Sequence, residues 1–166
     1  MFAVGDKIIY GKSGVCEVKN IGHPDMIGLD ENREYYTLQP MGSTETIFTP
    51  VDTGVFMRNI ISSDEAMALI RRIPEIERNT VMPENAAKEL PRVYDGLFQT
   101  HECEDLVRLI VILRTRAAKA AESKRKITQT DQAYMRNAED VLHGELAAAL
   151  GMEKSEMPAF IKSNIE

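Results

Sequence analysis

The hydrophobic pattern of this chain changes its period once, near residue 61, and this change constrains the fold more than any other feature. Up to residue 60, short runs rich in β-branched and aromatic residues alternate with turns that contain Gly or Pro, a pattern typical of short antiparallel strands. Beyond it, apolar residues recur at helical spacing, first at Ala66, Leu69, Ile70 and Ile73. The sequence therefore predicts an α+β chain with segregated parts, residues 1–61 and 62–166.

The first part is predicted to form four or five short strands. They cover residues 4–10, 15–21, 34–38 and 45–49, with a further run at 55–58. Closely spaced strands joined by Gly- and Pro-containing turns predict a small β-barrel of the Tudor or SH3 type. Such barrels usually serve as recognition modules, and an exposed edge strand can pair with a partner.

The second part is predicted to be an all-α helical bundle. Ser62 and Glu65 have the spacing of a capping box, and the helix that they begin is expected to end or kink at Pro74, with a connector over 75–83. Pro83 is expected to begin a helix that reaches about residue 98, with Pro91 as a kink or break. Further helices are predicted over 102–122, from a cap at Thr128 and Asp131 to Gly151, and over 155–161.

A basic block follows the most apolar of these helices. The chain has a formal net charge of -6, yet the segment from Arg114 to Lys126 contains six cations and one acid, Glu122. A solvated helix end, with cations that complement the helix dipole, explains about two or three of them. The block therefore favours contact with phosphate, of a weak and salt-sensitive kind that carries no base specificity.

No pattern typical of catalysis or metal binding is found. His23, His101 and His143 fall in separate segments without ligand spacing, and Gly-rich nucleotide-binding motifs are absent. We therefore expect no enzyme activity, no cofactor and no metal. Cys16 and Cys103 are expected to be buried, reduced thiols. No apolar run approaches the about 18–20 residues of a membrane helix, so a cytoplasmic protein without membrane contact is expected.

Seven segments match one family pattern: 4–10, 14–15, 35–38, 47–51, 58–62, 104–110 and 138–147. Together they resemble the CarD/CdnL family of bacterial transcription regulators, over nearly the whole chain. The opening residues 4–10 alone are less specific, because the transcription-repair coupling factor carries a similar polymerase-binding barrel. In combination with the Gly144-Glu145-Leu146-Ala147 helix they are quite specific.

The resemblance implies a Tudor-like N-terminal domain that binds the β subunit of RNA polymerase. It also implies a helical C-terminal domain that contacts promoter DNA at the upstream edge of the transcription bubble. Such proteins stabilise the open complex, are not enzymes and carry no cofactor. For this chain it implies a transcription regulator, cytoplasmic and nucleoid-associated; its edge strands would also permit a domain-swapped dimer.

Two departures from the family pattern bear on these contacts. Family members carry a Trp that wedges into the minor groove; its position falls near residues 85–87, and this chain has no Trp. Arginines that some relatives direct toward polymerase align near Pro24 and Phe48. The β-subunit contact is therefore expected to depend on strand pairing and on apolar groups such as Ile47 and Phe48.

Two functional hypotheses follow. In the first, the chain is a regulator that binds both RNA polymerase and the backbone of promoter DNA, weakly and without sequence specificity. In the second, it is a protein-only adaptor on polymerase without DNA contact, in keeping with the missing Trp. The residues expected to bind polymerase are Tyr10, Lys12, Ile47, Phe48, Thr49 and Pro50. The residues expected to bind DNA are Lys88, Arg92, Arg114, Arg116, Lys119, Lys124, Arg125 and Lys126.

Overall fold

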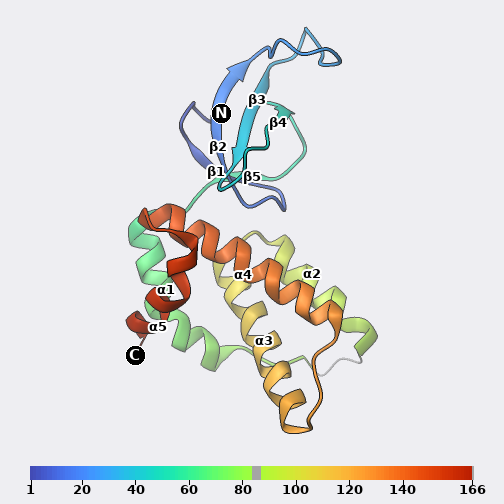
Figure 1. Cartoon of the computed structure of the whole chain (residues 1–166), viewed down its shortest axis with the longest axis vertical. Helices are drawn as coiled ribbons and strands as arrows, with labels where there is room; N and C mark the ends of the chain where they lie inside the picture. The colour runs from blue at the N-terminus through green and yellow to red at the C-terminus, as the bar shows by residue number, and fades with distance from the viewer. Residues whose placement is uncertain (84–86, 166) are drawn as a thin grey trace.

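A small sheet and a group of helices follow one another along the chain (Figure 1). The structure is a computed structural model that describes residues 1–83 and 87–165. The strands are β1 (Lys7–Tyr10), β2 (Val15–Gly22), β3 (Tyr35–Pro40), β4 (Ile47–Pro50) and β5 (Met57–Asn59). The helices are α1 (Ser63–Asn79), η1 (Ala87–Glu89), α2 (Leu90–Gln99), α3 (Cys103–Glu122), α4 (Gln129–Leu150), η2 (Lys154–Glu156) and α5 (Met157–Ile165). The predicted α+β class is confirmed.

The five strands form one antiparallel sheet in the order β4-β3-β2-β1-β5. Ile47 from one edge strand and Met57 from the other pack on the same core, which shows that the sheet is curled. That core consists of Ile8, Cys16, Val18, Tyr36 and Leu38. Each strand has one apolar face, and a small sheet can bury these faces only by curling over them.

Three helix ends form as their local side chains predict. The hydroxyl of Ser62 accepts a hydrogen bond from the Glu65 N–H, and the Glu65 side chain accepts one from the Ser62 N–H, which completes the capping box. The hydroxyl of Thr128 accepts from the Asp131 N–H and begins α4. Gly151 ends α4 with a φ of 67°, a left-handed conformation that favours glycine.

The helix boundaries predicted from two prolines differ from those in the structure. Helix α1 continues through Pro74 to Asn79. Proline removes one backbone hydrogen bond, but Ile76 beyond it is buried and holds the helix against the core. Of the helix predicted from Pro83 to about residue 98, residues 84–86 lie outside the described residues; α2 begins at Leu90 and Pro91 lies in its first turn, where its missing N–H costs no intrahelical bond.

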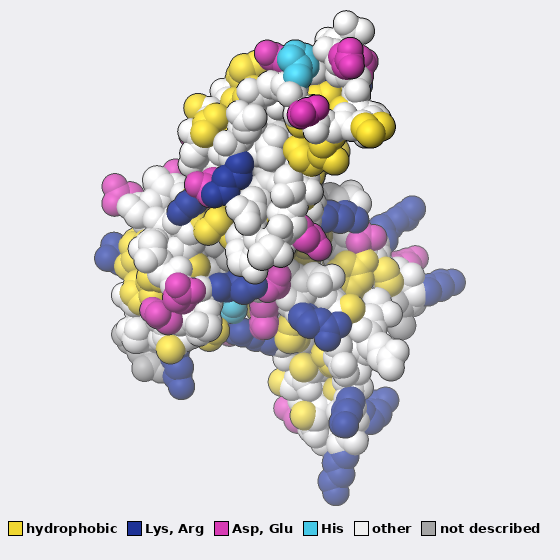
Figure 2. Space-filling view, turned by 45° about the horizontal axis from the view of Figure 1, so that its top comes forward, with side chains coloured by type: hydrophobic (Ala, Val, Ile, Leu, Met, Phe, Trp, Pro, Cys, Tyr) yellow, Lys and Arg dark blue, Asp and Glu magenta, His cyan; other side chains and the backbone are white. Residues whose placement is uncertain are grey.

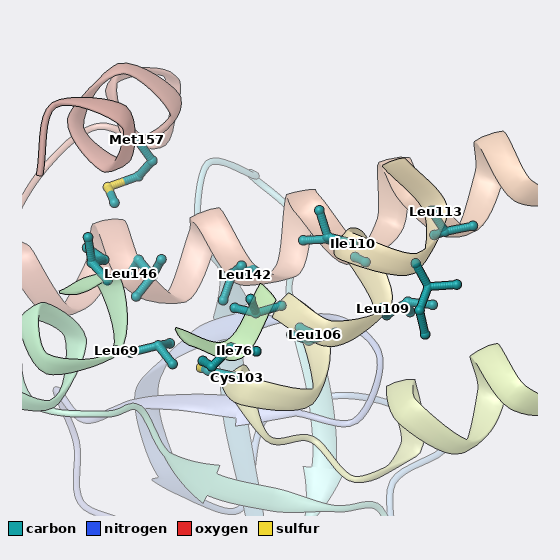
Figure 3. Packing of buried hydrophobic residues seen from close by; sticks show 14 of the residues in the cluster. Leu69, Ile76, Cys103, Leu106, Leu109, Ile110, Leu113, Leu142, Leu146 and Met157 are labelled. Atoms are coloured by element: carbon teal, nitrogen blue, oxygen red, sulfur yellow. The ribbon is translucent and has the colours of Figure 1, made fainter. Parts of the chain in front are cut away.

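The helices pack around α3, which contacts α1, α2 and α4. Its buried face includes Leu106, Leu109 and Leu113, and α4 contributes Leu142 and Leu146 (Figure 3). Each such leucine contributes about 1.5–3 kcal/mol relative to an exposed one. None of the helices in the described ranges is both long enough and apolar enough to cross a membrane.

Candidate functional site

Strand β4 lies at one edge of the sheet and pairs only with β3 in the part of the chain that the structure describes. Phe48 lies opposite Thr37 in this pairing. Ile47, Phe48 and Pro50 are half-buried, whereas Thr49 is 3% exposed. The free edge thus offers backbone groups flanked by partly exposed apolar side chains, which suits pairing with an extended segment of another protein.

Two of the predicted polymerase-binding residues contact each other inside the barrel. The Tyr10 hydroxyl donates a hydrogen bond to Oγ1 of Thr49 at 3.1 Å. These residues come from β1 and β4, which are not neighbours in the sheet. This hydrogen bond therefore stabilises the curled sheet from its interior. The outer surface of β4 is formed by Ile47, Phe48 and Pro50.

Lys12 lies in a different place, on the turn between β1 and β2. There it lines a cleft of about 860 Å³ together with Phe98 of α2 and Val141 of α4. No residue of β4 lines this cleft. The structure consequently brings Tyr10 together with the β4 residues but directs Lys12 toward the helical part.

The connection between α3 and α4 forms a basic tip at the far end of α3 from the sheet. We define the basic tip as Lys119, Lys124, Arg125 and Lys126. All four side chains are exposed, and none forms an ion pair with a described residue. Figure 2 shows Lys and Arg side chains gathered at this lower end of the molecule. The tip also carries Glu122, so its local charge is positive by three.

The backbone of the basic tip has a defined conformation. Lys124 adopts a φ of 57°, and the Arg125 N–H donates to the Ala120 carbonyl at 2.7 Å. The Lys124 N–H donates to the Ala121 carbonyl at 3.0 Å. This pattern satisfies the last carbonyls of α3 in the way that left-handed helix caps do, and it fixes how the three consecutive cations leave the helix.

The two remaining arginines of the basic block are engaged by carboxylates. Arg114 pairs with Glu139 at 3.2 Å, and its side chain stays 65% exposed. Arg116 pairs with Asp131 at 3.0 Å, and Asp131 is buried. Both pairs connect α3 with α4. Their geometry gives these arginines a role in holding the helical hairpin, which competes with contact to phosphate.

Lys88 and Arg92 lie on η1 and α2, and both are exposed. Helix α2 is held close to the start of α4, since the Tyr134 hydroxyl donates to Asp95 at 2.5 Å. This hydrogen bond raises the pKa of Tyr134 to about 12. The neighbouring Tyr94 packs against the Tyr134 ring, and burial raises its pKa to about 12. Of the segment where relatives carry the wedging Trp, residues 85 and 86 lie outside the described residues.

Comparison with known protein families identifies the sheet region. Residues 2–61 match the family model described as the CarD-like/TRCF RID domain. Residues 2–61 are therefore similar to a CarD-like/TRCF RID domain, and we call them the RID domain below. The match is consistent with a CarD-like protein, in agreement with the resemblance seen in the sequence. A search of curated proteins gave no match to the chain.

CarD-like/TRCF RID domains are found in transcription factors that interact with RNA polymerase, and residues 2–61 are similar to such a domain. Domains of this family are non-enzymatic modules for protein interaction. In the described ranges, no group of three or more His, Cys, Asp or Glu residues is placed to hold a metal ion.

The sequence analysis did not single out the residues that join the RID domain to the helices. Glu145 on α4 is 1% exposed and pairs with Arg58 on β5 of the RID domain. A signal for Glu145 is present in the sequence. It lies three residues after Leu142 and seven after Ala138, on the apolar face of α4, where a lone acid is unusual and requires a buried partner.

Proposed function

We propose that this chain binds the β subunit of RNA polymerase through its RID domain and contacts the promoter DNA backbone through its helical part, thereby stabilising the open complex. In this proposal residues 1–61 and 62–166 act as separate domains, and the protein is cytoplasmic and nucleoid-associated. In this proposal Ile47, Phe48 and Pro50 on β4 form the polymerase-binding face, which Tyr10 and Thr49 support from within, and the basic tip forms the centre of the DNA-binding face with Lys88 and Arg92. Arg114 and Arg116 hold the helical hairpin that carries the tip, and Lys12 lies in the separate cleft.

The observation that carries the DNA-binding role is the basic tip. Four exposed cations without ion pairs among the described residues gather at one end of an acidic chain. A patch of this size neutralises only a few phosphates and gives weak affinity by itself. Attachment of the RID domain to polymerase would raise the effective concentration of the tip near promoter DNA, so a weak contact becomes sufficient.

A charge-neutralising variant of the basic tip tests this function. Lys124→Gln, Arg125→Gln and Lys126→Gln together should shorten the lifetime of polymerase–promoter open complexes while polymerase binding persists. The salt dependence of DNA binding in the presence of polymerase should also weaken, by about one unit of log–log slope for each phosphate that the variant no longer neutralises. A matched control is the triple variant Arg71→Gln, Arg78→Gln and Lys162→Gln, which removes the same charge from exposed positions on α1 and α5.

The second candidate is a protein-only adaptor that binds polymerase without touching DNA. The pairing of Arg114 and Arg116 with carboxylates favours it, because these cations are already engaged within the helical hairpin. If the tip variant and the control variant leave the same open-complex lifetime and the same flat salt response, the adaptor replaces the DNA-binding proposal. A domain-swapped dimer through the edge strands is tested separately by the sedimentation mass of the chain.

A further inference from the structure

A buried carboxylate on α4 binds the RID domain to the helices. Glu145 accepts two hydrogen bonds from Arg58, from Nη1 to Oε2 at 2.6 Å and from Nη2 to Oε1 at 2.8 Å. Its Oε2 also accepts the Ile61 N–H at 2.9 Å, and its Oε1 accepts the Cys103 thiol at 3.2 Å. The carboxylate thus ties together β5, the segment that leads to α1, the start of α3 and the body of α4.

Arg58 makes a second set of contacts from the same strand. Its Nε and Nη2 donate to the His101 carbonyl at 3.2 and 2.7 Å. That carbonyl belongs to the turn between α2 and α3, where His101 has a φ of 59° that few residues other than glycine adopt. The Phe56 ring stacks on the His101 ring, with centroids 4.1 Å apart and an angle of 2° between the planes.

Strand alternation explains how Arg58 reaches the helices. Met57 packs on the barrel core, so the next side chain along β5 points to the opposite face. Arg58 is also fixed in the sheet by its pairing with Ile9. A planar guanidinium that binds a carboxylate with two parallel hydrogen bonds fixes direction as well as distance. We call this set of contacts, centred on Arg58 and Glu145, the interdomain latch.

The latch and the basic tip lie near opposite ends of α3. Cys103, which donates to Glu145, is the first residue of α3, and the basic tip begins near the other end of this helix (Figure 1). Twenty helical residues at a rise of 1.5 Å span about 30 Å. A rotation of about 20° at the latch would therefore move the tip by about 10 Å, more than the Debye length of about 8 Å at physiological salt.

We propose that Arg58 and Glu145 are positioning residues, which fix the orientation of the RID domain relative to α3 and so place the basic tip where promoter DNA passes. This inference rests on the proposed function. Without the latch the segment between Asn59 and Ser63 joins two bodies that can reorient, and the effective concentration of the tip at the DNA falls. Replacement of a buried charged pair by apolar residues often costs no stability, so in this proposal the pair serves to specify one arrangement.

The distance between the two parts can be measured directly. Spin labels at Thr44→Cys, on the exposed β3–β4 loop, and Ser123→Cys, beside the basic tip, report it by pulsed electron paramagnetic resonance. The parent chain should give one narrow distance distribution. Glu145→Gln and Arg58→Gln should each broaden it or shift its centre by several ångströms. A narrow, unshifted distribution in both variants would overturn the proposal.

A matched control separates positioning from loss of stability. Leu109→Ala removes a fully buried side chain of α3 that takes no part in the hydrogen bonds of the latch, so it should weaken the helical core and leave the orientation intact. Its distance distribution should remain narrow at a temperature where it is as folded as the latch variants. A distribution as broad as that of Glu145→Gln would assign the effect to core stability and overturn the positioning role.

The functional readout distinguishes this inference from the proposed function itself. The latch variants should bind polymerase as the parent does, and the gain in open-complex lifetime should fall by about ten-fold or more. If they broaden the distances and leave the lifetime unchanged while the tip variant shortens it, the positioning role is overturned and the proposed function stands. If the tip variant has no effect on the lifetime, the proposed function fails. The claim that the latch places the tip at promoter DNA then fails as well, even if the latch variants broaden the distance distribution.

Discussion

The Nε of Arg116 donates a hydrogen bond to Oδ2 of Asp131 across 3.0 Å, and this carboxylate, in the first turn of α4, is almost completely buried. Arg116 therefore keeps the end of α3 against the start of α4. The connection that carries Lys124, Arg125 and Lys126 is held between these two helices. Arg116 thus supports the structure of the basic tip, and its own charge is engaged by Asp131.

Removal of this pair should destabilise the chain. Arg116→Ala leaves the buried Asp131 carboxylate without its cation, and the free energy of unfolding should fall by about 2–4 kcal/mol, since Arg116 itself is partly exposed. Arg114→Ala breaks a pair whose arginine is 65% exposed and should cost less than about 1 kcal/mol. Urea denaturation of both variants measures the difference. Equal decreases would show that Asp131 finds water or another partner.

The capping box at α1 gives a second stability prediction. Ser62→Ala removes the hydroxyl that accepts the Glu65 N–H, and should lower the free energy of unfolding by about 1 kcal/mol. The neighbouring Ser63 is exposed and its side chain forms no hydrogen bond in the described structure, so Ser63→Ala is the matched control. Chemical denaturation that found the same decrease in both variants would contradict the capping role.

The two buried cysteines should make the stability of the chain depend on pH in the alkaline range. Burial raises the pKa of Cys16 from 9.0 to about 11, and burial likewise raises the pKa of Cys103. A raised pKa means that the folded state holds the thiol proton more tightly than the unfolded state. Stability from this source is complete below pH 9 and disappears as the pH rises toward 11.

Comparison of the parent with Cys16→Ala isolates this contribution. Between pH 8 and 11 the stability of the parent should fall by about 1–2 kcal/mol more than that of the variant, because the variant has no thiol at this position to ionise. Urea denaturation at several pH values provides the measurement. Parallel curves for the two proteins would show that Cys16 ionises as readily in the folded state as in the unfolded one. Both thiols should also react slowly with a thiol reagent at pH 8 until the chain is unfolded.

Sequence reasoning succeeded where one or two helical turns decide the outcome. Ser62, Thr128 and Gly151 act on backbone groups within four residues, so their patterns are complete in the sequence. The prolines show the limit of the same reasoning. Pro74 would end an isolated helix, but the burial of Ile76 beyond it decides the length of α1, and burial depends on the tertiary core.

The candidate site also combines features that nearby residues determine with features that depend on residues far apart in the sequence. The basic block was visible as a local excess of charge, but which cations remain free depends on residues 15 and 25 positions away, Asp131 and Glu139. The Arg58–Glu145 pair joins residues 87 positions apart. No periodicity in one sequence connects such positions, and only the unusual place of Glu145 on an apolar face hints that a partner exists.

Phe48 provides the test of the polymerase-binding face. It lies on the free edge strand β4, is half-buried and contributes apolar surface beside the backbone groups that a partner strand would pair with. Phe48→Ala should weaken binding of the RNA polymerase β subunit by about ten-fold, or about 1.4 kcal/mol, in the range of a moderately important interface residue.

The matched control for Phe48 is Ile27. This residue lies between β2 and β3, outside the predicted face, and is fully exposed, so Ile27→Ala removes apolar surface of similar kind without touching β4. It should leave binding unchanged in the same calorimetric or pull-down titration. Circular dichroism and the denaturation midpoint should be compared for both variants, because Phe48 also lies opposite Thr37 in the sheet. Unaltered binding by a folded Phe48→Ala variant would place the contact on another part of the RID domain and remove β4 from the polymerase-binding face.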